Sequence, residues 1–176
     1  MRYRVTVCLT ILVALATPSF AEILQGVVDA PLVAEQAQAT AGVVFQRAGA
    51  PSKVLSTEAI AVLKPFTQRA ALGGGAGEHG NEWTGPLLWD VLNAAGAIEG
   101  QRPRDQAHLA VRVTGADGYM AVVALGEISP QFANQPVQLA NRMNGTPLPG
   151  QGLRLIVPED AVGGRSVRDV VRIEVY

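Results

Sequence analysis

The chain has 176 residues, of which 48% are hydrophobic, 16% charged and 5% aromatic, and its formal net charge is -1. This length is enough for one globular domain with a buried core and too short for two domains of ordinary size. The apolar content excludes a disordered chain. Because the chain has no excess of positive charge and no helix-turn-helix, zinc-finger or RNA-recognition motif, we expect no nucleic-acid partner.

The N-terminal segment has the parts of a secretory signal peptide. Arg2 and Arg4 supply positive charge, and residues 5–16 form an uncharged apolar run. Ser19 and Ala21 then place small residues at the positions that signal peptidase reads. The apolar run is too short to anchor the chain in a bilayer. We therefore expect cleavage after Ala21, no membrane insertion afterwards, and a periplasmic or secreted mature protein.

This interpretation divides the chain into a signal peptide (1–21), an Ala- and Gln-rich leader (22–41) and a folded domain (42–176). The single cysteine, Cys8, lies in the signal peptide. A mature chain without cysteine forms no disulfide, has no thiolate nucleophile and binds no metal through sulfur. The domain must therefore be held together by its hydrophobic core.

The first half of the domain predicts one strand and two helices. Residues 42–46 are typical of a short strand, and residues 56–63 combine a capping hydroxyl, an acid in the first turn and an apolar run, as a short helix does. Residues 73–80 have the composition of a loop. A longer helix is predicted from Pro86, which suits the first helical position, to Gly96, which suits a helix end. The apolar residues between them repeat on one helical face.

The second half predicts strands. The runs 109–113 and 119–123 flank Asp117–Gly118, a dipeptide that favours a tight hairpin because glycine tolerates a positive φ. Asn144–Gly145 repeats this signal before the apolar run 153–158.

The C-terminal residues 167–176 alternate between apolar and polar side chains. Val171, Ile173 and Val175 fall on one face of the predicted strand, and charged or polar residues fall on the other. This period of two is typical of a half-buried strand. With its helices early and its strands late, the sequence predicts a single α+β domain that is rich in strands.

Residues 75–80 match the pattern G-x-G-x-x-G. A dinucleotide site needs a buried strand before this pattern and a helix that opens at its last glycine. Residues 81–86 contain Gly85 and Pro86 and cannot continue a helix from Gly80. We therefore interpret residues 75–80 as a surface loop.

His79 lies between Glu78 and Glu82 in the same part of the chain. A histidine beside carboxylates can act as a general base, a metal ligand or a cofactor contact. A metal site needs three or four ligands, and His108 has no helical or hairpin spacing to His79. We therefore favour a solvated loop residue and keep His79 as a secondary candidate. No G-x-S-x-G or H-E-x-x-H motif supports a serine hydrolase or a zinc peptidase.

Residues 163–168 form the other candidate site. Gly164 and the glycine before it let the backbone approach a ligand, and Arg165, Ser166 and Arg168 offer donors suited to phosphate or carboxylate. The alternative is a glycine turn that leads into an edge strand whose arginines face water. On spacing alone the second interpretation is favoured, and both stay open.

Five segments resemble, in order, the motifs of one family. Residues 82–92 resemble a W-x-G-x-x-L-x-x-L helix, residues 114–119 a D-G-Y hairpin, and residues 143–149 an M-N-G-x-P-L-P turn. Residues 152–158 are similar to a G-P-L-R-L-V-V-P strand, and residues 165–168 to a K-S-x-K segment before a final strand. The family that these segments resemble is the oxidoreductase molybdopterin-binding domain, which has the sulfite oxidase-like fold.

The resemblance implies a mixed α/β core that cradles molybdopterin in enzymes of oxygen-atom transfer or related reductions. It also implies a cysteine that ligates molybdenum on the loop before the W-x-G helix, but the matching residues 69–80 contain no cysteine. The leader reads Arg2-Tyr3-Arg4, without the adjacent arginines of twin-arginine export, and resembles a signal for unfolded export. The missing ligand and the export signal both argue against catalysis.

The preferred hypothesis is an exported, non-catalytic relative of this domain without a resident cofactor. It holds a small anionic ligand through Gly164, Arg165, Ser166 and Arg168, or it meets a protein partner such as the sensor part of a membrane receptor. The alternative is a molybdopterin-dependent oxidoreductase with an atypical ligand set, in which His79 lies near the metal. A further alternative is a subunit that works with a separate redox protein. The sequence leaves open whether the chain is an enzyme.

Overall fold

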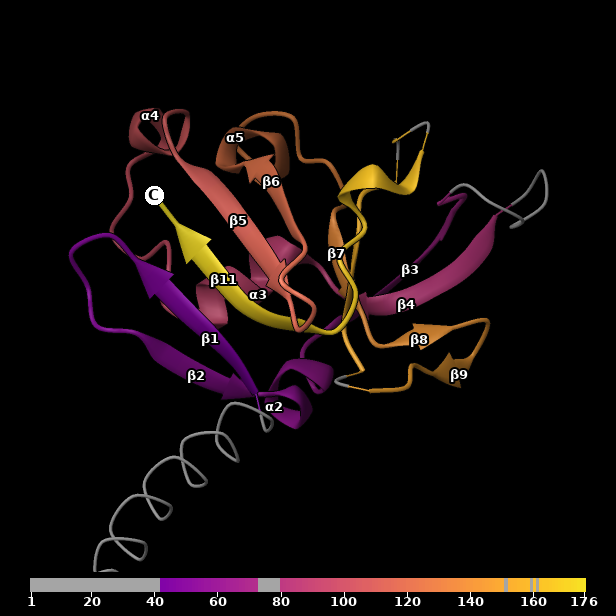
Figure 1. The fold of residues 1–176 in the computed structure, drawn as a ribbon. Coiled ribbons are helices and arrows are strands. Elements are labelled where there is room, and N and C mark those ends of the chain that lie inside the picture. Colours follow the sequence, from indigo (N-terminus) through magenta and orange to yellow (C-terminus); the bar gives the residue numbers. More distant parts are fainter. Residues whose placement is uncertain (1–41, 73–79, 151, 159, 161) are drawn as a thin grey trace, which may run out of the picture. The chain divides into compact units, whose positions relative to one another are not determined.

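The computed structural model describes residues 42–176, except for 73–79, 151, 159 and 161 (Figure 1). The predicted signal peptide and leader, and the predicted loop with His79, lie outside the described residues. None of the helices in the described ranges is long and apolar enough to cross a membrane.

The described strands are β1 (Gly42–Arg47), β2 (Lys53–Ser56), β3 (Pro65–Ala70), β4 (Asn81–Pro86), β5 (Ala110–Gly115), β6 (Met120–Ala124), β7 (Gln138–Ala140), β8 (Arg142–Met143), β9 (Thr146–Pro147), β10 (Arg154–Ile156) and β11 (Val170–Val175). The described helices are α2 (Thr57–Ala61), α3 (Leu88–Ala94), α4 (Pro103–Gln106), α5 (Leu125–Ile128) and the short 3-10 helix η1 (Gly163–Arg165).

Five strands form the larger sheet, in the order β2-β1-β11-β5-β6 (Figure 1). β1 and β11 are parallel, and the other neighbours are antiparallel. The predicted hairpin is confirmed, because β5 and β6 pair across a turn in which Gly118 has a φ of 81° and the Tyr119 N–H donates to Asp117 Oδ1 at 2.9 Å. The first and last predicted strands are confirmed as β1 and β11.

One detail of β11 differs from the predicted alternation. Val170, Ile173 and Val175 are buried, whereas Val171 is only half-buried. The pairing of β11 with β5 shifts register between Val170 and Arg172. This bulge inserts one residue into the strand and moves the inward-facing position from Val171 to Val170.

The smaller sheet has the order β3-β4-β8-β9, and β7 pairs with β10 in a separate two-stranded ladder. Asn144–Gly145 forms a tight turn with positive φ at both residues, as predicted. This turn joins β8 to β9 and does not lead directly into the apolar run 153–158. Only three residues of that run form a strand, β10. Pro149 and Gly152 stand between the turn and β10, and each disfavours regular strand pairing.

The helix prediction holds for α2 and needs correction for α3. Ser56 caps α2 as predicted, since its Oγ accepts the Ala59 N–H at 3.1 Å. Pro86, in contrast, ends β4, where it pairs with Pro65 of β3, and α3 begins at Leu88. The pairing keeps the backbone extended through Pro86, so the helix starts two residues later than the proline signal predicts.

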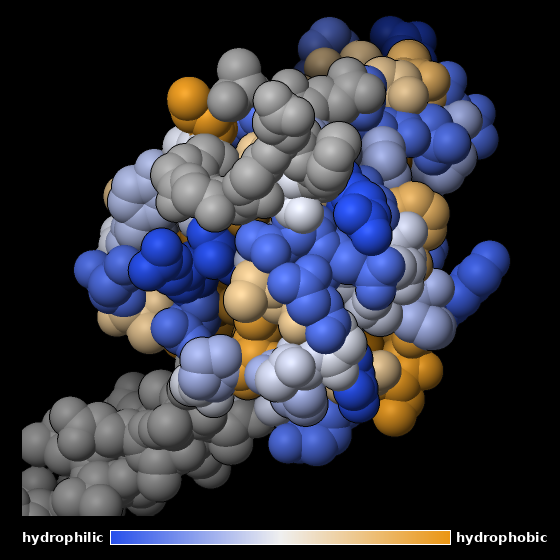
Figure 2. Space-filling model, turned by 90° about the vertical axis from the view of Figure 1, so that its right-hand side faces the viewer, coloured by the Kyte–Doolittle hydropathy of each residue, from blue (hydrophilic) through white to orange (hydrophobic). Residues whose placement is uncertain are grey.

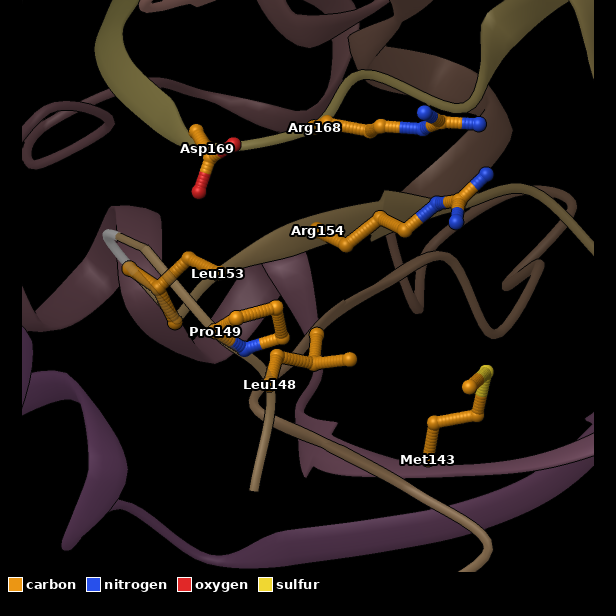
Figure 3. Close-up of a pocket in the computed structure, with 7 residues that line it drawn as sticks. All are labelled: Met143, Leu148, Pro149, Leu153, Arg154, Arg168 and Asp169. Atoms are coloured by element: carbon orange, nitrogen blue, oxygen red, sulfur yellow. The ribbon is translucent and has the colours of Figure 1, made fainter. Parts of the chain in front are cut away.

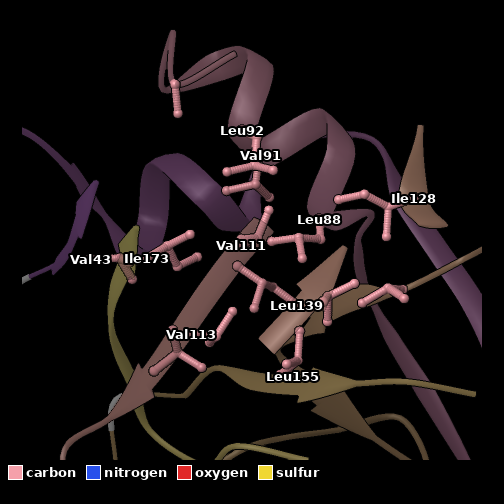
Figure 4. Close-up of a cluster of buried hydrophobic side chains, with 14 of the residues drawn as sticks. Val43, Leu88, Val91, Leu92, Val111, Val113, Ile128, Leu139, Leu155 and Ile173 are labelled. Atoms are coloured by element: carbon pink, nitrogen blue, oxygen red, sulfur yellow. The ribbon is translucent and has the colours of Figure 1, made fainter. Parts of the chain in front are cut away.

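The main hydrophobic core lies between α3 and the strands of the larger sheet and of β7 and β10. Figure 4 shows Leu88, Val91 and Leu92 of α3 facing these strands, and all three are fully buried. On the strand side, the fully buried residues labelled in the figure are Val43, Val111, Val113, Leu139, Leu155 and Ile173.

A second, smaller cluster lies where β3 and β4 meet β7 and β10. Its buried members are Ala70, Trp83, Ala140 and Ile156. Three partly buried residues at its rim are Leu72, Met143 and Leu148. The smaller sheet therefore has little core of its own, and its rim leaves apolar side chains facing outward.

Candidate anion-binding site

A cavity of about 240 Å³ lies beside the rim of the smaller cluster (Figure 3). Three segments enclose it: β8 and the residues after β9, the start of β10, and the residues just before β11. The segment before β11 runs beside β10, since the Leu155 N–H donates to the Val167 carbonyl at 2.9 Å and the Val170 N–H to the Leu153 carbonyl at 3.2 Å. The residues that line the cavity are Met143, Leu148, Pro149, Leu153, Arg154, Arg168 and Asp169.

Arg154 is held in place on two sides. Its guanidinium lies over the ring of Trp83, 5.1 Å from the centroid, and its Nε donates to Ser166 Oγ at 2.7 Å. Trp83 is buried, and its Nε1 donates to the Ala70 carbonyl at 3.2 Å. Stacking and a hydrogen bond at Nε fix the plane of the guanidinium, whose remaining N–H donors lie on its two terminal nitrogens.

Arg168 brings a second guanidinium to the first. Arg154 and Arg168 face each other across an antiparallel bridge, and Figure 3 shows their side chains extending in the same direction, one beside the other. Burial and, next, the positive charge of Arg168 lower the pKa of Arg154 from its ordinary value. Figure 3 shows both guanidinium groups extending away from the carboxylate of Asp169, the acidic side chain that lines the cavity with them. An oxyanion placed between them would relieve their repulsion and accept several charge-assisted hydrogen bonds.

Asp169 also lines the cavity, but at its other end. Figure 3 shows the Asp169 side chain at a distance from both guanidinium groups. The Asp169 carbonyl accepts the Ala116 N–H at 2.9 Å, which ties the residue before β11 to the β5–β6 turn. The carboxylate therefore leaves the positive end of the cavity open to an anion.

Arg165 is directed to carboxylates and does not line the cavity. Its guanidinium binds Asp160, with an Nη2–Oδ1 distance of 2.6 Å, and Glu127 of α5, with an Nη1–Oε1 distance of 3.2 Å. The hydrogen bond to Asp160 is the main cause of a raised pKa for Arg165. Since both carboxylates already occupy this guanidinium, its role in the structure is to anchor the segment that carries Ser166 and Arg168.

The two glycines of the segment make different contacts. The Gly164 carbonyl accepts the Tyr119 hydroxyl at 2.5 Å, which ties η1 to the start of β6. A Cβ on Gly163 would lie 2.2 Å from the Leu72 carbonyl oxygen, whereas a Cβ on Gly164 would meet nothing within 4 Å. Gly163 therefore permits a close approach of η1 to the chain after β3. Gly164 is fixed by the hydrogen bond that its carbonyl accepts.

The predicted site residues thus separate into two groups. Ser166 and Arg168 come together around Arg154. Gly164 and Arg165 instead fix the segment through their contacts with Tyr119 and Asp160. His79, the secondary candidate, lies outside the described residues. Sequence reasoning did not assign Arg154 to the site. Its signal was a charged residue inside the apolar run 153–157, where a cation needs a compensating contact.

The fold and the cavity define a class: a strand-rich α+β domain with an arginine pair in a surface cavity. The chain belongs to the oxidoreductase molybdopterin binding domain family, whose model matches residues 45–176. The family resemblance seen in the sequence is confirmed. The described fold, strand-rich with few helices, confirms the predicted class of α+β domain.

Among solved structures, the chain is similar to the sulfane dehydrogenase SoxCD from Paracoccus pantotrophus, with a TM-score of 0.58 and 19% identity. The match covers 77% of this chain and 38% of that one, so the chain corresponds to well under half of the SoxCD chain. At this identity the likeness establishes the fold. The comparison with curated proteins gives no match.

The residues present do not fit a molybdenum centre of the kind that the family resemblance implies. The only cysteine of the chain is Cys8, far from the residues that match the ligand loop. No group of three or more His, Cys, Asp or Glu side chains in the described part of the chain is arranged to hold a metal. Guanidinium groups donate hydrogen bonds and cannot ligate a metal. The cavity therefore has the chemistry of an anion site.

Proposed function

We propose that this chain is an exported, non-catalytic binding module of the molybdopterin-binding domain family, which holds a small anion between Arg154 and Arg168. One observation carries the proposal: the guanidinium groups of Arg154 and Arg168 lie side by side in a cavity whose lining carboxylate, Asp169, stands at the other end. Trp83 and Ser166 position Arg154 before any ligand arrives, which lowers the entropy lost on binding. Export is supported by the charge and hydropathy of residues 1–21.

Titration calorimetry with inorganic phosphate and sulfate at low ionic strength tests the anion site. We expect binding by the wild-type domain and a loss of about tenfold or more in each of Arg154→Met and Arg168→Met, because hydrogen bonds to charged groups contribute about 1.5–3 kcal/mol. Methionine keeps the unbranched stem and its packing while removing the charge. Arg104→Met, on the exposed face of α4, is the matched control for loss of one positive charge. Equal phosphate affinity in all four proteins would contradict the proposal.

Elemental analysis separates this proposal from the molybdopterin-dependent oxidoreductase. Mass spectrometry for molybdenum and tungsten, on protein purified from its native host, should find neither at stoichiometric amount. A near-stoichiometric metal content would overturn the non-catalytic role and assign the arginine pair to a bound cofactor.

The exported state has its own test. Intact-mass analysis of the protein from a periplasmic extract should give a chain that begins at Glu22, after loss of residues 1–21. A chain that keeps its first residues and stays with the cytoplasm would contradict export.

A further inference from the structure

The larger sheet has a second face that does not belong to the main core. Its inward side chains pack against α3, which Figure 1 shows behind the sheet, so the outward face is turned toward the viewer. Strand pairing places two rows of side chains on this outward face. The first row is Val54, Val44, Arg172, Thr114 and Met120, and the second is Gln46, Glu174, Arg112 and Val122. We call these two rows, together with Tyr176 next to Arg112, the outer face.

The outer face carries a large share of the exposed apolar side chains. Nine large apolar side chains are exposed among the described residues, and four of the nine lie on this face. The four are Val54, Met120, Val122 and Tyr176. Figure 2, which views the molecule at right angles to Figure 1, shows hydrophilic residues with small groups of apolar ones between them. The outer face thus has apolar borders at β2 and β6, and exposed apolar surface of this kind marks sites of protein interaction.

The centre of the outer face carries two arginines and one glutamate. The Glu174 carboxylate lies between them, with an Oε1 distance of 3.2 Å to Arg172 Nε and an Oε2 distance of 3.6 Å to Arg112 Nη1. Arg172 also donates to Gln46 Oε1. The distance to Arg112 is too long for a hydrogen bond, so Arg112 holds the shared carboxylate more weakly than Arg172 does. The centre is therefore positive, although the formal net charge of the chain is -1.

Arg112 is positioned to bind a carboxylate from another molecule. Its guanidinium lies 4.9 Å from the centroid of the Tyr176 ring, and the two side chains line a hollow of about 280 Å³ together with Gln46 and Glu174. Stacking on the ring restricts the guanidinium, while 40% of the Arg112 side chain stays exposed. Because one carboxylate is shared by two guanidinium groups, a second carboxylate in the hollow would gain charge-assisted hydrogen bonds from Arg112.

We propose that the outer face is the docking surface for an acidic amphipathic helix of a partner protein, with a carboxylate on Arg112 and aliphatic side chains over Met120 and Val122. Arg112 and Val122 are paired across β5 and β6, and neighbouring strands lie about 4.8 Å apart. Side chains three or four residues apart on a helix are separated by about 5–6 Å, so one helical turn spans both contacts. Tyrosine, methionine and arginine are residue types enriched at protein interfaces.

A second copy of this chain is a poorer occupant of the outer face. It would bring two further arginines with one glutamate to a centre that is already positive. The docking surface is also separate from the proposed anion site, because the two hollows share no lining residue.

Photo-crosslinking in the full chain, produced in its native host, tests which molecule covers the outer face. A photo-reactive amino acid replaces Val122 or, as the control, Val62, an exposed valine at the end of α2. We expect a specific adduct from Val122 and not from Val62, and mass spectrometry should place it in a segment with a carboxylate beside aliphatic residues. No adduct from Val122, the same adduct from both positions, an adduct between two copies of this chain, or an adduct to a segment without acidic residues would each overturn the proposal.

Calorimetry with a synthetic peptide of the cross-linked segment then tests the contacts. Arg112→Gln should weaken binding by about fivefold or more, because it removes charge-assisted hydrogen bonds. Arg104→Gln, at an exposed arginine of α4, is the matched control and should stay within about twofold of wild type. Glu174→Gln should strengthen binding, since it removes the carboxylate that competes for Arg112. Equal affinity in all four proteins would overturn the proposal, and phosphate binding should be unchanged in Arg112→Gln, so its failure is distinct from that of the anion site.

Discussion

The two sheets of this domain differ in how many buried apolar residues pack against them. The larger sheet shares the main core with α3, and nearly all of its inward-facing residues are buried. The smaller sheet shares a cluster that has four buried members among the described residues, and most of β3 is exposed. The cavity opens beside this smaller cluster. The difference teaches that packing is unevenly distributed, because dense packing fills one region and looser packing leaves partly buried apolar side chains beside the cavity in the other.

The first way to test this separation is to make the same truncation in both regions. Leu155→Ala, at a fully buried position of the main core, should lower the free energy of unfolding by about 2–5 kcal/mol, because it removes contacts and leaves a cavity. Leu148→Ala, at the rim of the smaller cluster, should lower it by about 1 kcal/mol or less. Urea unfolding measures both losses. Equal losses would show that the two regions share stability evenly.

The second test uses the adjacent glycines of η1. Gly163→Ala places a methyl group against the Leu72 carbonyl and should cost about 1–3 kcal/mol of stability, because the backbone has to shift. The shift should also weaken phosphate binding, since the same segment carries Ser166 and Arg168. Gly164→Ala, where the added Cβ meets open space, is the control and should leave both properties close to wild type. Similar behaviour of the two variants in calorimetry and urea unfolding would rule out the close approach.

The third test has the smallest expected effect. Ser166→Ala removes the acceptor of the Arg154 Nε–H and should cost about 1 kcal/mol of stability, which is typical of one hydrogen bond. Phosphate affinity should fall by several fold, because the guanidinium keeps its stacking on Trp83 but loses its fixed rotation. Ser166→Thr, which keeps the hydroxyl, should recover most of the affinity. Unchanged phosphate binding in Ser166→Ala would show that Trp83 alone positions Arg154.

Local signals in the sequence predicted the parts of the fold that depend on near neighbours. Asp117–Gly118 predicted the β5–β6 hairpin, and Ser56 predicted the start of α2, because a turn and a cap need only a few adjacent residues. The β3–β4 hairpin was not predicted. β3 is mostly exposed and carries three polar residues in a row, so it lacks the apolar alternation that marks a strand. Its pairing with β4 overrides the helix signal of Pro86.

The sequence predicted only the part of the candidate site that lies within one short segment. Ser166 and Arg168 stand in that segment. Arg154 could not be assigned to the site, because only the folded structure brings Trp83 and Ser166 into contact with it. Arg165 could not be separated from Arg168 by composition. Of its two carboxylate partners, Asp160 lies five residues before it, at no regular helical or strand spacing, and Glu127 lies 38 residues away along the chain. Only the tertiary structure brings both carboxylates to Arg165.

The position of β11 has a consequence for the order in which the domain folds. β11 lies in the middle of the larger sheet, between β1 and β5, although it follows both of them in the chain. Until residues 170–175 pair with both neighbours, the larger sheet has a gap at its centre. Such long-range pairing is slow compared with local structure formation. Arg168 lies two residues before β11, and the arginine pair is therefore assembled in the same step that completes the sheet.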